Sequence, residues 1–212
     1  MTTILTLLVT LIVPWAIQAQ TPVSTDGPAI PKIPDVNPEI LRLVAEDQWD
    51  RGHDMFTGRQ VRPPDSLDWE AVARRDAERQ AAIRALLADG HIQSAGDYRF
   101  AALIFQHSAK RENLALAHIL ASTAVAKGGP AKWLAAATLD RYLHALEQPQ
   151  VFGTQFIAGD QGAWTMEPYD QTAVSDRLRA EWCVIPVDEQ RRILEDLRKG
   201  GPLRPTSLPE CR

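Results

Sequence analysis

The chain lacks the residue patterns that mark several functional classes. It has no cluster of lysine and arginine and a net charge of -4, which argues against a general nucleic-acid-binding protein, because such a protein needs a basic face. It contains no His-Glu-x-x-His and no Cys-x-x-Cys, so the sequence predicts no metal site and no cofactor. It also lacks Gly-x-Ser-x-Gly, which leaves a serine nucleophile without support.

Cysteine is scarce as well. The chain has 2 cysteines, Cys183 and Cys211, both near the C-terminus. In an oxidising compartment an even number of cysteines favours a bridge, and a loop of this size would add roughly 3 kcal/mol of stability in the chain-entropy view. We therefore predict a Cys183–Cys211 disulfide. The alternative is two free thiols, with Cys183 packed in the core.

The composition is otherwise that of an ordinary globular protein. Of its 212 residues 45% are hydrophobic and 24% are charged. A chain of this length fits one domain with a sizeable core.

An apolar run opens the chain. It extends from Ile4 to Ile17 and is followed by Gln18-Ala19-Gln20. A membrane-spanning helix needs roughly 20 apolar residues, so the run is short for a span and favours a secretory signal peptide. We predict a signal peptide over residues 1–19, and export to the periplasm or out of the cell, with no membrane span after cleavage. A retained N-terminal anchor is the alternative.

Residues 20–36 predict an extended linker, because prolines recur there among serine, threonine and glycine. The remainder, 37–212, predicts one mostly α-helical domain that ends in a proline-rich tail. Helical periodicity, capping residues and glycine stops indicate about seven helices, over residues 37–51, 65–89, 95–109, 113–127, 130–148, 172–183 and 187–199. The fifth is apolar on several sides and is expected to be central.

One β-hairpin is predicted at residues 151–167. Val151 to Ile157 is β-branched and aromatic, residues 158–162 carry a turn signal, and residues 163–167 indicate a return strand. Because an isolated hairpin is marginally stable, we expect it to pack on the helices.

Polar side chains interrupt the predicted apolar helix faces at four positions: Asp47, Asp76, His107 and Asp140. A buried carboxylate without a partner costs several kcal/mol, so each must find one. Arginines stand three or four residues after the first two aspartates, and Arg141 follows the third. If the faces converge, they form one polar cluster inside the helical domain.

Two interpretations of such a cluster stay open. In the first, Asp76 or Asp140 acts with His107 as acid and base, with Thr154 and Gln155 at the rim, because burial and neighbouring charges separate pKa values. In the second, the cluster is an ion-pair and hydrogen-bond network that fixes how the helices pack.

The motifs also carry a family resemblance. Gln106-His107, Leu139-Asp140-Arg141 and the segment from Gln150 to Gln155 resemble an uncharacterised family of bacterial proteins, a domain of unknown function, whose members share a Gln-His pair, an Asp-Arg pair and a Tyr/Phe-Gly-Thr-Gln ending. The resemblance spans residues 38–194 and implies no established activity. It marks these residues: Asp47, Asp76, His107, Asp140, Arg141 and Gln155. Phe152 stands where tyrosine is commoner, so no role rests on a hydroxyl there.

The sequence thus leaves three hypotheses for function. The first is an exported helical module that binds an unknown protein or small-molecule ligand, through residues Asp47, Arg141, Thr154 and Gln155. The second is a hydrolase-type enzyme with catalytic candidates Asp76, His107 and Asp140. The third is a helical-repeat-like scaffold without a site, although no 34-residue self-similarity is evident.

Overall fold

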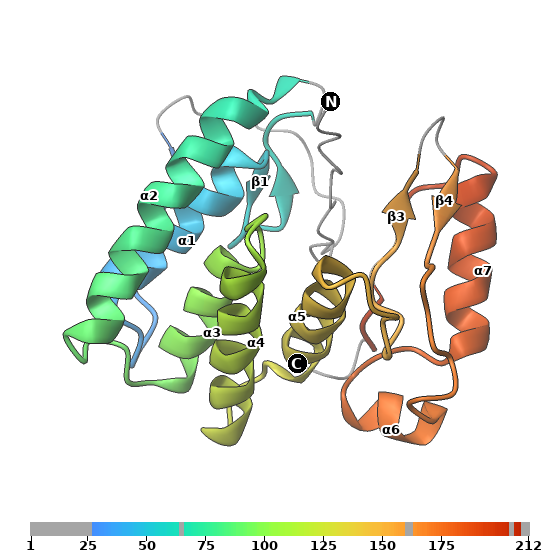
Figure 1. The fold of residues 1–212 in the computed structure, drawn as a ribbon. Coiled ribbons are helices and arrows are strands. Elements are labelled where there is room, and N and C mark those ends of the chain that lie inside the picture. The colour runs from blue at the N-terminus through green and yellow to red at the C-terminus, as the bar shows by residue number, and fades with distance from the viewer. Residues whose placement is uncertain (1–26, 64–65, 160–162, 204–205, 209–212) are drawn as a thin grey trace.

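The fold is mostly helical, as the sequence predicts. A computed structural model describes residues 27–63, 66–159, 163–203 and 206–208, and these contain seven helices and two small antiparallel sheets (Figure 1). None of the described helices is long and apolar enough to cross a membrane. The predicted signal peptide, residues 1–19, and Cys211 lie outside the described residues, so the signal and the disulfide stay predictions.

The helices follow the order that the sequence predicts. Their bounds are α1 Pro38–Asp50, α2 Trp69–Ala88, α3 Ala95–Phe105, α4 Arg111–Ala126, α5 Lys132–Ala145, α6 Asp176–Glu181 and α7 Val187–Arg198. Asn37 caps α1 through the amide of Glu39, and Asp68 caps α2 through the amide of Ala71, because the first amides of a helix have no partner within it. Gly90 adopts a left-handed φ of 72° just after α2 and ends it.

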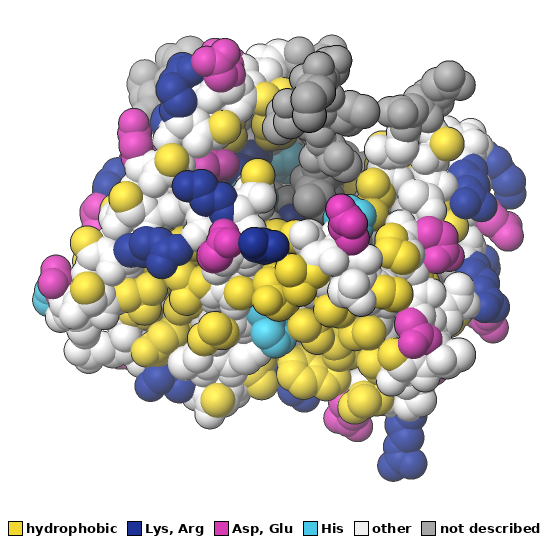
Figure 2. Space-filling model, in the orientation of Figure 1, with side chains coloured by type: hydrophobic (Ala, Val, Ile, Leu, Met, Phe, Trp, Pro, Cys, Tyr) yellow, Lys and Arg dark blue, Asp and Glu magenta, His cyan; other side chains and the backbone are white. Residues whose placement is uncertain are grey.

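Helices α1 to α5 pack around one apolar core. Its fully buried members include Ile40 and Val44 from α1, Ile83 from α2 and Phe105 from α3. The α5 helix buries residues on several sides and lies between α4 and the C-terminal part of the chain, so its predicted central place is confirmed (Figure 1). Hydrophobic side chains also gather on the outer face over α4 and α5 (Figure 2). Ile119 of α4 is 58% exposed.

A smaller apolar cluster joins the hairpin to α7. Strands β3 Ile157–Ala158 and β4 Trp164–Thr165 pair antiparallel, with Ile157 opposite Thr165. Phe156 and Met166 pack with Ile193 of α7. The predicted hairpin is therefore present but shorter than expected. A second pair, β1 His53–Asp54 with β2 Arg59–Gln60, was not predicted and follows α1.

The segment before the hairpin is a tightly bonded loop instead of a strand. The carbonyl of Phe152 accepts hydrogen bonds from Arg179 Nε at 3.2 Å and Gln190 Nε2 at 2.8 Å. The Gln190 Oε1 atom accepts from the hydroxyl of Tyr169 at 2.7 Å. Gly153, with a φ of 79°, lies against both of these side chains, which explains why the sequence has glycine here.

Gly153→Ala should therefore destabilise the protein strongly. An added Cβ would lie 2.3 Å from Gln190 Oε1, and the left-handed backbone adds its own cost, so we expect a loss of about 2 to 4 kcal/mol in the free energy of unfolding. Urea denaturation measures it. Gly90→Ala is the matched control, because its φ is also left-handed but no atom lies within 4 Å of the new Cβ. Equal losses in the two variants would contradict the packing explanation.

Candidate functional site

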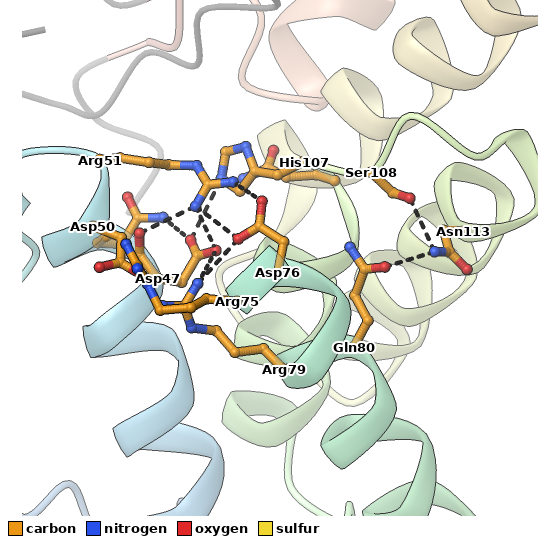
Figure 3. Close-up of polar contacts among 12 residues, drawn as sticks. Asp47, Asp50, Arg51, Arg75, Asp76, Arg79, Gln80, His107, Ser108 and Asn113 are labelled. Atoms are coloured by element: carbon orange, nitrogen blue, oxygen red, sulfur yellow. Dashed lines mark hydrogen bonds and ion pairs between the residues drawn. The ribbon is translucent and has the colours of Figure 1, made fainter. Parts of the chain in front are cut away.

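Oppositely charged side chains meet between α1 and α2 and point toward one another (Figure 3). We call this group the charge cluster, and its members are Asp47 and Asp50 of α1, Arg51 at the C-cap of α1, and Arg75, Asp76 and Arg79 of α2. On α1 the three fall at i, i+3 and i+4, and on α2 at i, i+1 and i+4, so each set lies on one helix face. The two faces meet because α1 packs on α2.

Arginines hold the buried carboxylates of the charge cluster. Arg51 donates to Asp47 at 2.8 Å and to Asp76 at 2.5 Å, and Arg79 donates to Asp76 at 3.0 Å. The Arg51–Asp47 and Arg79–Asp76 pairs are those that the i+4 and i+3 spacings predict, whereas the Arg51–Asp76 bond between the two helices was not predicted. Asp47 is fully buried and also accepts from Gln48 Nε2 at 2.6 Å. The carboxylates are therefore engaged in ion pairs that join two helices.

Asp50 is a member that the sequence analysis missed. It accepts from Arg75 Nε at 2.6 Å and from Arg79 Nη2. The signal was present in the sequence, because Asp50 stands beside Arg51 on the α1 face and Arg75 beside Asp76 on α2. Seeing it required knowing that these two helices are neighbours.

His107 lies at the edge of the charge cluster. It follows Gln106, the C-cap of α3, and its Nε2 lies 3.6 Å from Asp47 Oδ2. The turn that carries it is held by Asn113 Nδ2, which donates to Ser108 Oγ at 2.9 Å and to Gln80 Oε1 at 2.8 Å (Figure 3). Burial, and then the positive charges of Arg51, Arg141 and Arg79, hold the pKa of His107 well below its ordinary value. The imidazole is therefore neutral at physiological pH.

Asp140 belongs to a different network. Its carboxylate accepts from the amides of Val151, Phe152 and Thr154 at 2.9, 3.0 and 2.9 Å, and from the Thr154 hydroxyl at 2.8 Å. Gln155 donates to the Thr154 hydroxyl at 2.8 Å and to the Ala137 carbonyl at 3.3 Å. Burial raises the pKa of Asp140, and the three backbone donors oppose the rise.

The single convergent cluster is thus corrected to two. Among the described residues no hydrogen bond or ion pair joins Asp140, Thr154 or Gln155 to Asp47 or Asp76. The reason is that Asp140 fixes the loop that follows its own helix, so its oxygens are used locally. Thr154 and Gln155 bind this loop and α5 and do not form the rim of a pocket around His107.

Arg141 is the unusual residue of the site. It lies on α5, is 3% exposed, and donates through Nη1 to the Gln106 carbonyl at 3.2 Å. No carboxylate of the described residues forms an ion pair with it, and its buried Nε has no hydrogen-bond partner in this part of the chain. Burial, and then the charge of Arg51, lower its pKa to about 10, so the guanidinium stays charged at neutral pH.

No group of three or more His, Cys, Asp or Glu side chains among the described residues is arranged to hold a metal ion. The chain was also compared with known proteins, and no family model, curated protein or solved structure matches it. The resemblance to an uncharacterised bacterial family therefore stays a prediction, and the site must be interpreted from its geometry.

The titration of Asp47 makes stability depend on pH. Burial raises its pKa from 3.8 to about 7, so the folded protein keeps a proton there that the unfolded chain releases above about pH 4. The stability that Asp47 contributes is therefore complete below about pH 4 and is lost as the pH rises through about 7.

Asp47→Asn removes this titration. The free energy of unfolding of the native protein, minus that of the variant, should fall by more than about 1 kcal/mol between pH 5 and pH 8. His107 and the arginines are common to both proteins, so their own titrations largely cancel. Urea denaturation at the two pH values measures the difference, and Asp188→Asn, at an 83% exposed side chain, is the control that should show no such fall. A constant or growing difference for Asp47→Asn would contradict the assignment.

Proposed function

We propose that this protein is a binding module that holds a small anion, a carboxylate or a phosphate, at Arg141. One observation carries the proposal: Arg141 is a buried guanidinium with no carboxylate partner among the described residues. A buried charge without a counter-ion costs several kcal/mol, and folded proteins rarely keep one without a compensating partner. A bound anion is the partner that would balance this charge.

The surroundings of Arg141 favour an anion. Nη1 is used by the Gln106 carbonyl, which leaves the edge that carries Nε for a ligand. This edge presents two parallel N–H groups, and a carboxylate or phosphate binds them with two oxygens. The positive charges of Arg51, Arg141 and Arg79 all help to lower the pKa of His107.

One edge of the charge cluster lies close to solvent. The side chains of Arg51 and Asp76 are each 11% exposed, and that of Asp50 is 14% exposed. The cluster therefore touches solvent between α1 and α2, while Arg141 lies deeper.

The geometry supports the hydrolase hypothesis less well than it supports anion binding. Asp76 forms ion pairs with two arginines, Arg51 and Arg79, which engage both of its carboxylate oxygens. Asp140 accepts four hydrogen bonds from its own loop. The carboxylate of Asp47 lies 3.6 Å from His107 Nε2, and Asp47 is not one of the proposed catalytic residues.

The proposal retains the predicted export of the protein. The apolar run at residues 4–17 would export the module, and a Cys183–Cys211 disulfide would suit an oxidising compartment. The ligand would then be a small anion available outside the cytoplasm.

Anion binding at Arg141 is testable by thermal unfolding at constant ionic strength. Replacing chloride with acetate or inorganic phosphate should raise the Tm of the native protein by roughly 2 to 4 °C, because a ligand that binds only the folded state stabilises it. Arg141→Met should fold, since it removes a buried charge, and should lose the rise. Phosphate also stabilises proteins without binding, so the difference between the two proteins is the relevant quantity.

Arg99→Met is the matched control for that experiment. Burial also lowers the pKa of Arg99, but this side chain lies over the ring of Phe100. Its variant should keep the anion-dependent rise. An equal rise in Arg141→Met, or none in the native protein, would contradict the proposed function.

A further inference from the structure

The outer side of α4 carries no charged side chain over most of its length. Between Glu112 and Lys127 the helix reads NLALAHILASTAVA, which contains no acid, no lysine and no arginine. The helix packs against α3 and α5, and its remaining side is open to solvent (Figure 1). The solvent sides of α2 and α7, by contrast, carry glutamates and arginines. An uncharged side that faces water sets α4 apart and is typical of a helix that packs against a partner.

Ile119 lies at the centre of this side. Its side chain is 58% exposed, more than that of any other large hydrophobic residue that the structure describes. Ala115, Ser122 and Ala126 share its helix face, because they stand four residues before it and three and seven residues after it. Thr123 lies there as well, and its hydroxyl already donates to the Ile119 carbonyl at 2.8 Å. One branched apolar side chain among small ones allows a second helix to pack closely. We call these five residues the α4 face.

Opposite charges stand at the two ends of the α4 face. Glu112 lies seven residues before Ile119 and Lys127 eight residues after it, and both are exposed. If a second copy lays its α4 antiparallel across Ile119, Lys127 of each copy lies beside Glu112 of the other. Arg111 lies about 100° round the helix from Glu112, on the side away from Lys127, so it does not oppose this pairing.

The present partners of these two charges leave them able to rearrange. Arg111 Nε lies 3.3 Å from a Glu112 carboxylate oxygen, but both side chains are largely exposed, and such surface ion pairs contribute little. The Lys127 ammonium lies 5.7 Å from the centre of the Tyr98 ring, at the exposed end of the helix.

We infer that the α4 face binds a second copy of this chain, with the two α4 helices antiparallel and crossing at Ile119. The inference goes beyond the anion proposal and does not depend on it. In a twofold dimer each residue of the interface meets its counterpart in reverse order, so the surface must be complementary to itself. An apolar centre with an acid and a base at nearly equal distances on either side has this property. The pattern therefore favours a second copy over an unrelated partner.

The size of the α4 face limits the strength of the dimer. The helix has 16 residues and is about 24 Å long. One helix pair buries less area than the roughly 1,200 to 2,000 Å² of stable complexes, so we expect a Kd of about 10 to 100 µM. Sedimentation equilibrium of the full chain over a range of concentrations measures it.

Ile119→Lys places two like charges at the crossing point. Its Kd for self-association should rise at least about tenfold, while the fold is kept because the position faces solvent. Leu178→Lys is the matched control, because Leu178 is also a large exposed hydrophobic residue, at 46%, but lies on α6. Its Kd should match that of the native protein. Any association through the apolar run at residues 4–17 is common to all three proteins, so only α4 contributes to the difference.

Charge exchange tests the antiparallel arrangement. Glu112→Lys alone brings lysines together at both ends of the dimer, and Lys127→Glu alone brings glutamates together, so each variant should associate about threefold more weakly. An equimolar mixture of the two variants should associate more tightly than either alone, because every lysine then meets a glutamate. Within one chain the two positions are about 22 Å apart, so this recovery can arise only between copies.

Three results would overturn the inference. A native protein that stays monomeric up to about 1 mM would leave the α4 face to a different partner. An equal Kd for the native protein and Ile119→Lys would place the contact between copies elsewhere. A mixture of Glu112→Lys and Lys127→Glu that associates no better than the single variants would exclude the antiparallel pair. None of these results bears on anion binding, because Arg141 is buried on α5 and does not belong to the α4 face.

Discussion

Burial of opposite charges between α1 and α2 is the constraint on which the site depends. Taking a carboxylate or a guanidinium out of water costs several kcal/mol per ion, so Asp47 and Asp76 are tolerated only where Arg51 and Arg79 reach them. These pairs fix how α1 lies on α2. Their geometry also uses every carboxylate of the charge cluster, and Arg141, approaching from α5, has none to bind.

The second network is anchored by the residue next to Arg141 on α5. Asp140, one residue before Arg141, turns its oxygens to the loop at residues 151–154 and joins α5 to the C-terminal part. Arg179 and Gln190 hold the same loop from the other side through the Phe152 carbonyl. The Asp-Arg pair of α5 thus has two separate roles, since the aspartate fixes a loop and the arginine faces the charge cluster.

Local signals predicted the helices and the short-range pairs. Asn37, Asp68 and Gly90 mark helix ends because their chemistry is local, and the spacing of Asp47 and Arg51 predicts their pair for the same reason. The periodicity shows that Asp140 is buried, but it does not show what packs against it. The loop at 151–154 was predicted as strand from its β-branched and aromatic residues, although side chains far along the sequence take its backbone hydrogen bonds. No sequence pattern predicted the role of Arg179, which lies in α6 and is 1% exposed.

The central claim is that a bound anion, and not a carboxylate of the described residues, balances the guanidinium of Arg141. A crystal structure of the protein grown with acetate tests it most directly, through the density next to Arg141 Nε. We expect a carboxylate at hydrogen-bond distance from the guanidinium. An Asp or Glu side chain of the chain itself paired with Arg141 would contradict the account.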